Sequence, residues 1–280
     1  MGSRPAGHAL LAWYLEMGVD EAIEETPVDR FASGNPDRPD RRVPPARRPV
    51  PSSREGAEKA SAGPGPETAA SFNLTVPEEA VHSARAVAAA CTTIDALVEA
   101  IRGFERCALK QTATNTVIYD GNPDARLMLI GEAPGAEEDR QGLPFVGPAG
   151  RLLDRMLAAI ELDRRSAYIT NVLYWRPPGN RVPTAEEIGT CLPFAERQIE
   201  LIAPRVVVFV GGIAAKAMLG RSEGITKFRG RWFRYQTPRM SAPVQATATY
   251  HSAFLLRQPG RKREAWRDLL AIKAKLALPD

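Results

Sequence analysis

The stretch LMLIGEAPGAEEDRQGLPFVG occupies residues 127–147 of this chain. Together with Arg126, its first residues form a short, mainly apolar run at 126–130, of the kind that forms a fully buried parallel strand. Gly131, Pro134 and Gly135 then exclude both helix and strand, so the backbone of the loop can approach a ligand closely. Four acidic side chains follow within eight residues, namely Glu132, Glu137, Glu138 and Asp139. We therefore expect a buried strand that delivers carboxylates to a cleft.

A helix start offers a second explanation for these acidic side chains. The positive end of the helix dipole favours carboxylates in the first turn of a helix. However, residues 141–147 (QGLPFVG) keep the chain irregular and place one aromatic side chain, Phe145, between two glycines. We interpret Glu137 and Asp139 as a charged helix start and expect Glu138 to have a chemical task.

Strands and helices alternate along the rest of the chain. The predicted strands are 126–130, 167–172, 206–210 and 245–249. The predicted helices are 77–104, 149–160, 184–202, 213–219 and 260–277. Alternation of this kind is typical of a parallel sheet covered on both faces. We predict an α/β fold, a three-layer α/β/α sandwich around a central, mainly parallel four-stranded sheet.

The chain divides into three parts by composition. Residues 8–25 have apolar side chains at helical spacing, so we predict an N-terminal amphipathic helix within residues 1–30, whose apolar face would bind an unknown protein partner. Residues 31–75 are rich in Pro, Gly, Ser and Arg and are predicted to be a disordered linker. The catalytic domain is expected at residues 76–280.

Composition excludes several classes of protein. With 280 residues and 44% hydrophobic content, the chain is long enough for one sizeable core, and we expect a soluble monomer. No run approaches the roughly 18 apolar residues of a membrane span. The N-terminus is acidic where a signal peptide would be basic and then apolar, so a cytoplasmic location is expected. Three cysteines, Cys91, Cys107 and Cys191, are too few for a disulfide framework and poorly spaced for zinc.

Charge is unevenly distributed. Residues 221–280 contain 13 Lys and Arg against 4 Asp and Glu, although the whole chain has a net charge of only +4. A basic C-terminal part favours a polyanionic partner.

Chemically competent residues follow the predicted strands. In parallel sheets, ligands bind beyond the carboxyl ends of the strands. Asn171 ends the second predicted strand, and Tyr250 and His251 follow the fourth. The third ends at Gly211 and Gly212, which allow close approach of a helix or a phosphate. No Ser-His-Asp order and no phosphate-binding GxxxxGK loop competes with this set.

Three motifs in this order carry a family resemblance. They are GEAPGAEED with PFVG, NVLYWRPPGNR with PT-x-EE, and HSAFLLR. With these motifs, the chain resembles the family 4 uracil-DNA glycosylases of the uracil-DNA glycosylase superfamily, over about residues 104–273. The resemblance implies a monofunctional DNA repair enzyme that flips uracil out of single- or double-stranded DNA. It would hydrolyse the N-glycosidic bond and leave an abasic site for base excision repair.

The resemblance also implies roles for individual residues. Asn171 would read the uracil edge through its amide donor and acceptor, and Phe145 would stack on the base. His251 would donate a hydrogen bond to uracil O2 as the base leaves as an anion, and Glu138 would orient the water and offset positive charge on the sugar. Glu132 would exclude the thymine methyl group. Gly131 and Ala133 of the same loop would also line the uracil site.

Contacts with DNA are expected after His251. Leu255 and Leu256 would enter the base stack beside a phosphate-binding Arg257, although one leucine is expected to pack inward. Ser252 belongs to the same DNA-binding set. Further phosphate contacts are expected from basic residues, namely Arg229, Arg231, Arg261, Lys262 and Arg263.

Two departures from the family pattern stand out. Ser252 replaces the proline that usually follows the histidine, so the loop loses a residue with a fixed φ. The family's 4Fe-4S cluster uses four cysteines; Cys107 and Cys191 match two of them, but Phe104 and Trp175 occupy the other two positions, and neither can ligate iron. We therefore expect no cofactor and no metal, with a cluster as the alternative.

Two other functions remain open. The first is a uracil-DNA-binding or crosslinking relative, although the basic insertion of that class is missing after residues 176–181 (RPPGNR). The second is an interaction protein with an inactive glycosylase fold.

Overall fold

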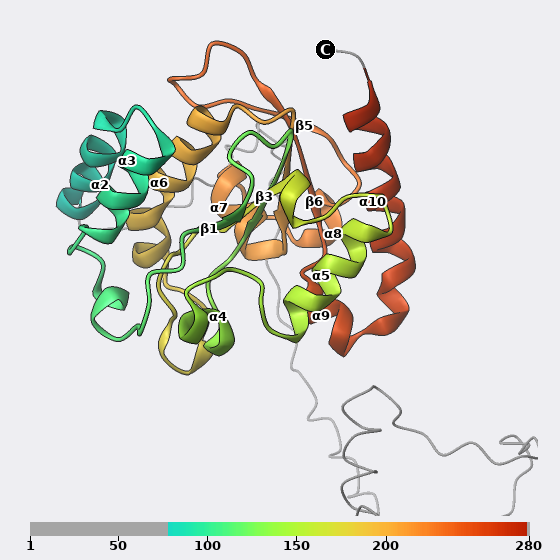
Figure 1. Cartoon of the computed structure of the whole chain (residues 1–280), viewed down its shortest axis with the longest axis horizontal. Helices are drawn as coiled ribbons and strands as arrows, with labels where there is room; N and C mark the ends of the chain where they lie inside the picture. The colour runs from blue at the N-terminus through green and yellow to red at the C-terminus, as the bar shows by residue number, and fades with distance from the viewer. Residues whose placement is uncertain (1–77, 279–280) are drawn as a thin grey trace, which may run out of the picture. The chain divides into compact units, whose positions relative to one another are not determined.

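The computed structural model describes residues 78–278, which fall in one compact unit (Figure 1). The helices are α2 (Glu78–Ala90), α3 (Ile94–Arg102), α4 (Ala136–Gln141), α5 (Pro148–Ala158), α6 (Ala185–Ile202), α7 (Gly212–Leu219), α8 (Ile225–Phe228), α9 (Ser252–Arg257) and α10 (Lys262–Ala277). The strands are β1 (Tyr119–Gly121), β2 (Leu127–Gly131), β3 (Ala167–Asn171), β4 (Val206–Val210), β5 (Phe233–Tyr235) and β6 (Val244–Thr249). Single 3-10 turns include η2 (Arg164–Ser166) and η3 (Pro178–Asn180).

The described strands form one sheet in the order β1-β3-β2-β4-β6-β5. The inner strands β3, β2, β4 and β6 run parallel, which confirms the predicted parallel core. The edge strands β1 and β5 are antiparallel to their neighbours and were not predicted. Each has three residues, too few to show the period-2 pattern of a strand.

Both faces of the sheet are covered by helices, as predicted for a three-layer sandwich. Alternate residues of β2 point to opposite faces. Met128 and Ile130 join a core with α2, α3, α6 and α7, whereas Leu127 and Leu129 join a second core with α5, α9 and α10. Figure 1 shows α2, α3 and α6 on one side of the strands and α5 and α10 on the other. β2 is therefore buried on both faces, as its unbroken apolar sequence requires.

The predicted helix over residues 77–104 is wrong in its continuity, because the structure has two helices there. Residues 91–93 are not helical, and α3 begins after them. The Thr93 side chain accepts a hydrogen bond from the Ala96 backbone N–H at 3.2 Å and so caps α3. The extended backbone of Thr93, with φ −133° and ψ 161°, prevents one continuous helix, although the apolar periodicity continues across it.

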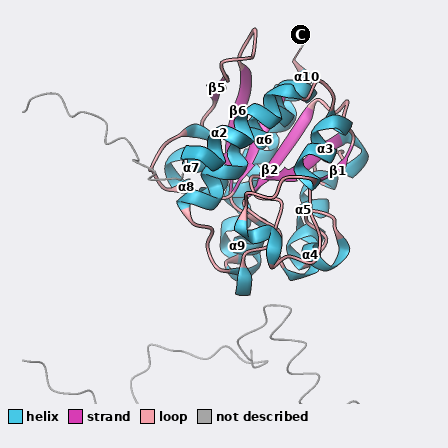
Figure 2. Ribbon diagram, turned by 90° about the vertical axis from the view of Figure 1, so that its left-hand side faces the viewer, coloured by secondary structure: helices cyan, strands magenta, loops and turns pink. Residues whose placement is uncertain are grey.

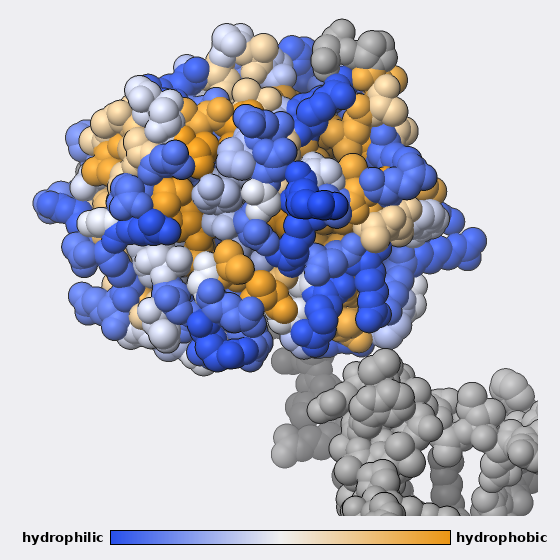
Figure 3. Space-filling view, in the orientation of Figure 1, coloured by the Kyte–Doolittle hydropathy of each residue, from blue (hydrophilic) through white to orange (hydrophobic). Residues whose placement is uncertain are grey.

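Polar residues dominate the face shown in Figure 3, with apolar groups among them. Within the described range, no helix is both long and apolar enough to cross a membrane. The predicted N-terminal helix within residues 1–30 and the linker at 31–75 lie outside the described residues. The short helices α4 and α9 lie at the same end of the sheet in both ribbon views (Figures 1 and 2). This is where the candidate site forms.

Candidate active site

A cavity of about 440 Å³ opens beyond the carboxyl ends of the parallel strands. Its size falls within the range of small-molecule sites. Residues predicted from the sequence line it, namely Glu132, Ala133, Glu138, Phe145, Asn171, His251 and Arg257. Sequence reasoning missed other lining residues, namely Pro134, Gly135, Ala149, Pro177, Asn180, Arg181 and Ala253. The polar groups expected to meet at one edge of the sheet do so.

Gly131 is not itself in the cavity wall, but it allows two predicted residues to meet there. It ends β2 and is the register partner of Asn171, which ends β3. A Cβ atom at Gly131 would lie 2.3 Å from Asn171 Oδ1 and 2.6 Å from Phe145 Cζ. Only glycine lets the amide and the ring approach the strand end this closely.

The side-chain amide of Asn171 has an unused acceptor. Asn171 is 2% exposed, and its Oδ1 is one of two buried side-chain oxygen or nitrogen atoms without a hydrogen-bond partner within residues 78–278. Buried polar atoms are rarely left unpaired, because each costs about 1–3 kcal/mol. An unpaired amide in a cavity wall indicates a site for a ligand with complementary polar groups.

An aromatic surface lies beside this amide. The rings of Phe145 and His251 are stacked, with centroids 5.6 Å apart and planes inclined by 26°. Both residues line the cavity. Gly211, directly after β4, leaves room for the His251 side chain, because a Cβ atom at position 211 would lie only 3.1 Å from His251 Cβ. The prediction gave a helix or a phosphate as the group that approaches Gly211, whereas the structure places the His251 side chain there.

The hydrogen bonding of His251 fixes which ring nitrogen carries the proton. His251 caps α9, and its Nδ1 accepts a hydrogen bond from the Ala253 N–H at 3.1 Å. Nδ1 is therefore unprotonated, and a neutral ring carries its proton on Nε2. Burial, reinforced by the charge of Arg257, lowers the pKa of His251 to about 4, and Glu138 opposes this shift. At neutral pH the residue is a neutral donor.

Glu138 is held by the backbone of its own loop. Oε1 accepts hydrogen bonds from the Val146 and Gly147 N–H groups, both at 3.0 Å, and Oε2 accepts from the Gly135 N–H at 3.1 Å. A carboxylate offers about four lone-pair directions, so about one remains, on Oε2. The carboxylate is fixed in the cavity wall and can still accept a hydrogen bond from water.

Glu132 and Asp139 differ in their surroundings. Glu132 lines the cavity, and burial raises the pKa of its carboxyl above the usual range. Asp139 points elsewhere: its Oδ1 accepts from the Thr114 and Asn115 N–H groups at 2.8 and 3.1 Å. Asp139 therefore joins α4 to the loop that precedes β1 and is not part of the cavity.

The predicted DNA-binding residues after His251 separate into two pairs. Ser252 and Leu255 are buried, at 0% and 1% exposure, and Leu255 packs in the core with α5 and α10. Leu256 is 41% exposed and Arg257 lines the cavity. Because these residues form helix α9, side chains on its inner face pack against the core. The prediction of direct DNA contact by Ser252 and Leu255 is therefore wrong, because both side chains are buried. One of the two leucines packs inward, as expected.

Arg229 is not available for a phosphate contact. Its guanidinium donates to both carboxylate oxygens of Asp268, at 2.9 and 3.1 Å, and lies over the Tyr250 ring at 5.0 Å from the centroid. Its side chain is only 16% exposed. The prediction for Arg229 is therefore wrong, because the arginine is part of the internal support of β6 and α10.

Comparison with known proteins gives the family. The model of the uracil DNA glycosylase superfamily matches residues 118–270, more than half of the chain. The chain belongs to this superfamily. A type-4 uracil-DNA glycosylase of Archaeoglobus fulgidus is 40% identical over 184 residues, which cover 64% of this chain and 92% of the relative. One of Thermotoga maritima is 40% identical over 160 residues, covering 57% and 81%.

A more distant relative is a type-5 uracil-DNA glycosylase of Thermus thermophilus, 32% identical over 176 residues that cover 56% of this chain and 78% of the relative. The resemblance to family 4 inferred from the three motifs is confirmed, as is the predicted α/β/α fold. Identity to the type-4 relatives exceeds that to the type-5 relative.

The cysteine positions of this glycosylase do not fit a 4Fe-4S cluster. Cys107 and Cys191 are buried with their sulfurs 4.0 Å apart. At the other two positions, Phe104 packs edge-on against Phe194 with centroids 5.1 Å apart, and Trp175 donates from Nε1 to Thr116 Oγ1 at 3.1 Å. In the part of the chain that the structure describes, no three potential metal-ligating side chains come together. Two thiols cannot complete the four-cysteine ligand set of such a cluster.

Proposed function

We propose that this chain is a monofunctional uracil-DNA glycosylase and that the cavity lined by Asn171, Phe145, His251 and Glu138 is its active site. The observation that carries the proposal is the unpaired Asn171 Oδ1 beside the stacked Phe145 and His251 rings. A planar base with its own donors and acceptors is the ligand that such a pair of surfaces fits. Membership of the superfamily and the names of the similar relatives agree with uracil as that base.

The base must leave the helix before it can reach the cavity. Flipping costs a few kcal/mol of unstacking, which contacts in the pocket offset. Phe145 stacks on the base, and the Asn171 amide hydrogen-bonds to its O4 and N3-H edge. Leu256, exposed on α9, fills the gap left in the stack, while Arg257 binds a phosphate nearby. Glu132 lies in the same wall and would exclude the thymine methyl group.

Bond cleavage then separates charge. Negative charge develops on uracil O2, and the neutral His251 donates a hydrogen bond from Nε2 to that oxygen. Positive charge develops on the sugar, which the Glu138 carboxylate offsets. The free lone pair of Glu138 holds the attacking water, and the three backbone N–H groups prevent the carboxylate from turning away. Because these groups line one cavity, turnover is favoured over a binding or crosslinking role.

We also propose that the protein works without an iron-sulfur cluster. The aromatic side chains of Phe104 and Trp175, both in the same buried core as Cys107 and Cys191, would join the two segments by packing. Iron analysis and visible absorbance of protein purified without oxygen test this proposal. Stoichiometric iron with cluster absorbance would contradict it.

Several finer properties stay predictions. They are action on single- or double-stranded DNA, the monomeric state, the cytoplasmic location and the protein partner of the N-terminal segment. An excision assay across hypoxanthine and xanthine substrates, on both single and double strands, would measure the substrate range.

An oligonucleotide with one deoxyuridine tests the function directly. We expect wild-type protein to release uracil and leave a site that breaks only after treatment with alkali, because the motifs offer no lysine for a lyase step. The matched oligonucleotide with thymine should stay intact. His251→Ala should retain DNA binding but lose at least about 100-fold in rate, as removal of one oxyanion donor does. No uracil release by the wild type would refute the proposal.

A further inference from the structure

The stacking residue Phe145 has a strained backbone. Its φ of 54° lies in the left-handed region, which bulky residues rarely adopt unless their surroundings enforce it. Its side chain is 4% exposed and faces His251 in the cavity. Since φ sets the direction of the side chain, the position of the ring depends on whatever holds this backbone.

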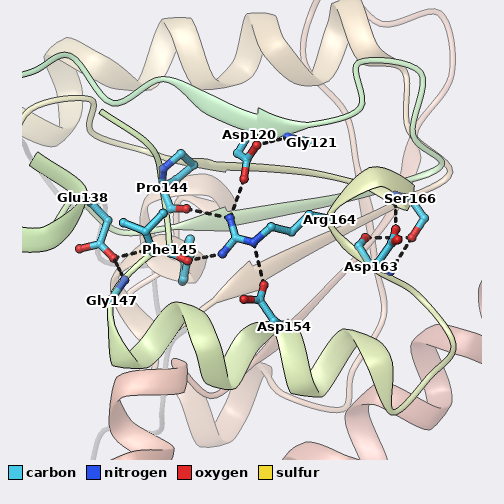
Figure 4. A network of polar contacts seen from close by, with 11 residues as sticks. Asp120, Gly121, Glu138, Pro144, Phe145, Gly147, Asp154, Asp163, Arg164 and Ser166 are labelled. Carbon is cyan, nitrogen blue, oxygen red and sulfur yellow. Dashed lines mark hydrogen bonds and ion pairs between the residues drawn. The ribbon is translucent and has the colours of Figure 1, made fainter. Parts of the chain in front are cut away.

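Arg164 holds it. Arg164 begins η2, directly before β3, and its guanidinium reaches the loop that precedes α5 (Figure 4). Nη1 donates to the Pro144 carbonyl oxygen at 3.2 Å, and Nη2 donates to the Phe145 carbonyl oxygen. The two carbonyls flank the strained φ, so the arginine fixes the peptide groups on both sides of it.

Two carboxylates in turn hold the guanidinium. Nη1 donates to Asp120 Oδ2 of β1 at 2.6 Å, and Nε donates to Asp154 Oδ1 of α5 at 2.7 Å. The Arg164 side chain is 23% exposed, so solvent screens these ion pairs only in part. Figure 4 shows the guanidinium between the two aspartates with the Pro144 and Phe145 carbonyls on its other side.

Helix α5 also packs against the Phe145 carbonyl. A Cβ atom on Gly150 would lie 1.7 Å from the Phe145 carbonyl oxygen. Only a glycine at this point lets α5 pack directly against the strained peptide group. The carbonyl thus contacts both the backbone of α5 and the guanidinium of Arg164, and a shift of the arginine would move the ring.

We propose that Arg164 is a positioning residue for base excision that acts through Phe145. Arg164 does not line the cavity and so cannot contact the flipped base. It keeps the Phe145 ring at the height and angle at which a base can stack on it. This inference rests on the proposed excision activity and adds a residue that none of the three sequence motifs contains.

Lysine cannot replace this arginine. The guanidinium presents donors in a fixed planar fork, which here serves two carboxylates and two carbonyls at once. A lysine ammonium can keep a positive charge between Asp120 and Asp154 but is a single point. Arg164→Lys therefore preserves much of the ion pairing and releases the carbonyls, which separates positioning from global folding.

The test measures single-turnover release of uracil from a deoxyuridine oligonucleotide. Arg164→Lys should reduce the rate constant by about 10- to 100-fold, as expected for misplacement of a reacting group by about 1 Å. Binding of the same oligonucleotide without uracil should change less than about 2-fold. Arg165→Lys is the matched control, because the neighbouring Arg165 side chain is 92% exposed and pairs with Asp163 at the surface. Its rate should equal that of the wild type.

A double-mutant cycle with Phe145→Ala identifies the route of the effect. If Arg164 acts through the ring, Arg164→Lys should lower the rate less than about 2-fold once the ring is removed. Equal losses in both backgrounds would overturn the positioning role, as would an unchanged rate for Arg164→Lys alone. The absence of excision by the wild-type protein would instead refute the proposed function, so the two failures are distinguishable.

Discussion

Acidification should leave His251 neutral far below the pH at which a histidine usually titrates. With a pKa of about 4 instead of 6.5, about 10% of His251 would be protonated at pH 5, compared with about 97% for an unperturbed ring. We therefore expect the His251 ring resonances, followed by NMR, to stay in the neutral form with the proton on Nε2 from pH 8 to pH 5.

The same shift predicts how stability depends on pH. Because the folded pKa is below the unfolded value, only the unfolded chain takes up this proton between pH 6.5 and 4, so the His251 contribution lowers stability as pH falls through this range. A difference of about 2.5 pH units corresponds to at most about 3 kcal/mol of unfolding free energy. His251→Gln should reduce the acid-induced loss of stability, measured by denaturant unfolding at pH 7 and pH 5.

The single-turnover rate gives a functional check on this prediction. Between pH 8 and pH 5 we expect the single-turnover rate to show no transition with a midpoint near pH 6.5. Burial also raises the pKa of Glu132, so the profile is repeated with Glu132→Gln to remove that titration. A midpoint near pH 6.5 for the His251 resonances, or for the rate in both proteins, would refute the neutral-donor mechanism.

Four further substitutions test separate parts of the site. Glu138→Gln replaces one oxygen that accepts backbone hydrogen bonds by an NH2 donor. We expect a loss of about 1–3 kcal/mol in unfolding free energy and a slower rate of uracil release. Denaturant unfolding that matches the wild type would contradict this expectation. Ser252→Pro should raise the unfolding free energy by about 1 kcal/mol in the same measurement. Ser252 is the first residue of α9, and the ψ of 136° at His251 suits a following proline. The substitution also removes the Ser252 Oγ, which is buried without a hydrogen-bond partner within residues 78–278. Leu256→Ala should weaken binding of uracil-containing DNA without loss of stability, whereas Leu255→Ala should cost about 2–5 kcal/mol of stability; the reverse pattern in titration and unfolding would be incompatible with the observed burial.

The sequence was sufficient for the parallel core and for the residues at its edge. Buried parallel strands are short unbroken apolar runs, and their carboxyl ends must lie together, so Asn171 and His251 could be placed at one site without coordinates. The short edge strands β1 and β5 could not, since three residues carry no periodic signal. Their pairing is decided by the neighbouring strands.

Side-chain partners far apart along the chain were also beyond sequence reasoning. Arg164 and Asp120 are separated by 44 residues, and neither lies in a motif. Arg229 looked like a DNA contact because the region is basic, but its guanidinium is paired with Asp268, a buried residue of α10. Leu255 and Leu256 are adjacent, and only the orientation of α9 decides which one is buried. Such choices depend on packing, which one sequence does not encode locally.

Removal of the Asn171 amide tests the central claim most directly, because this amide is the proposed reader of the base. The measurement is the single-turnover rate of uracil release by wild type, Asn171→Ala and the control Asn122→Ala, whose residue lies at the β1–β2 turn outside the cavity. We predict a loss of at least about 100-fold for Asn171→Ala with unchanged binding of uracil-free DNA, and a wild-type rate for the control. Undiminished uracil release by Asn171→Ala would contradict the account.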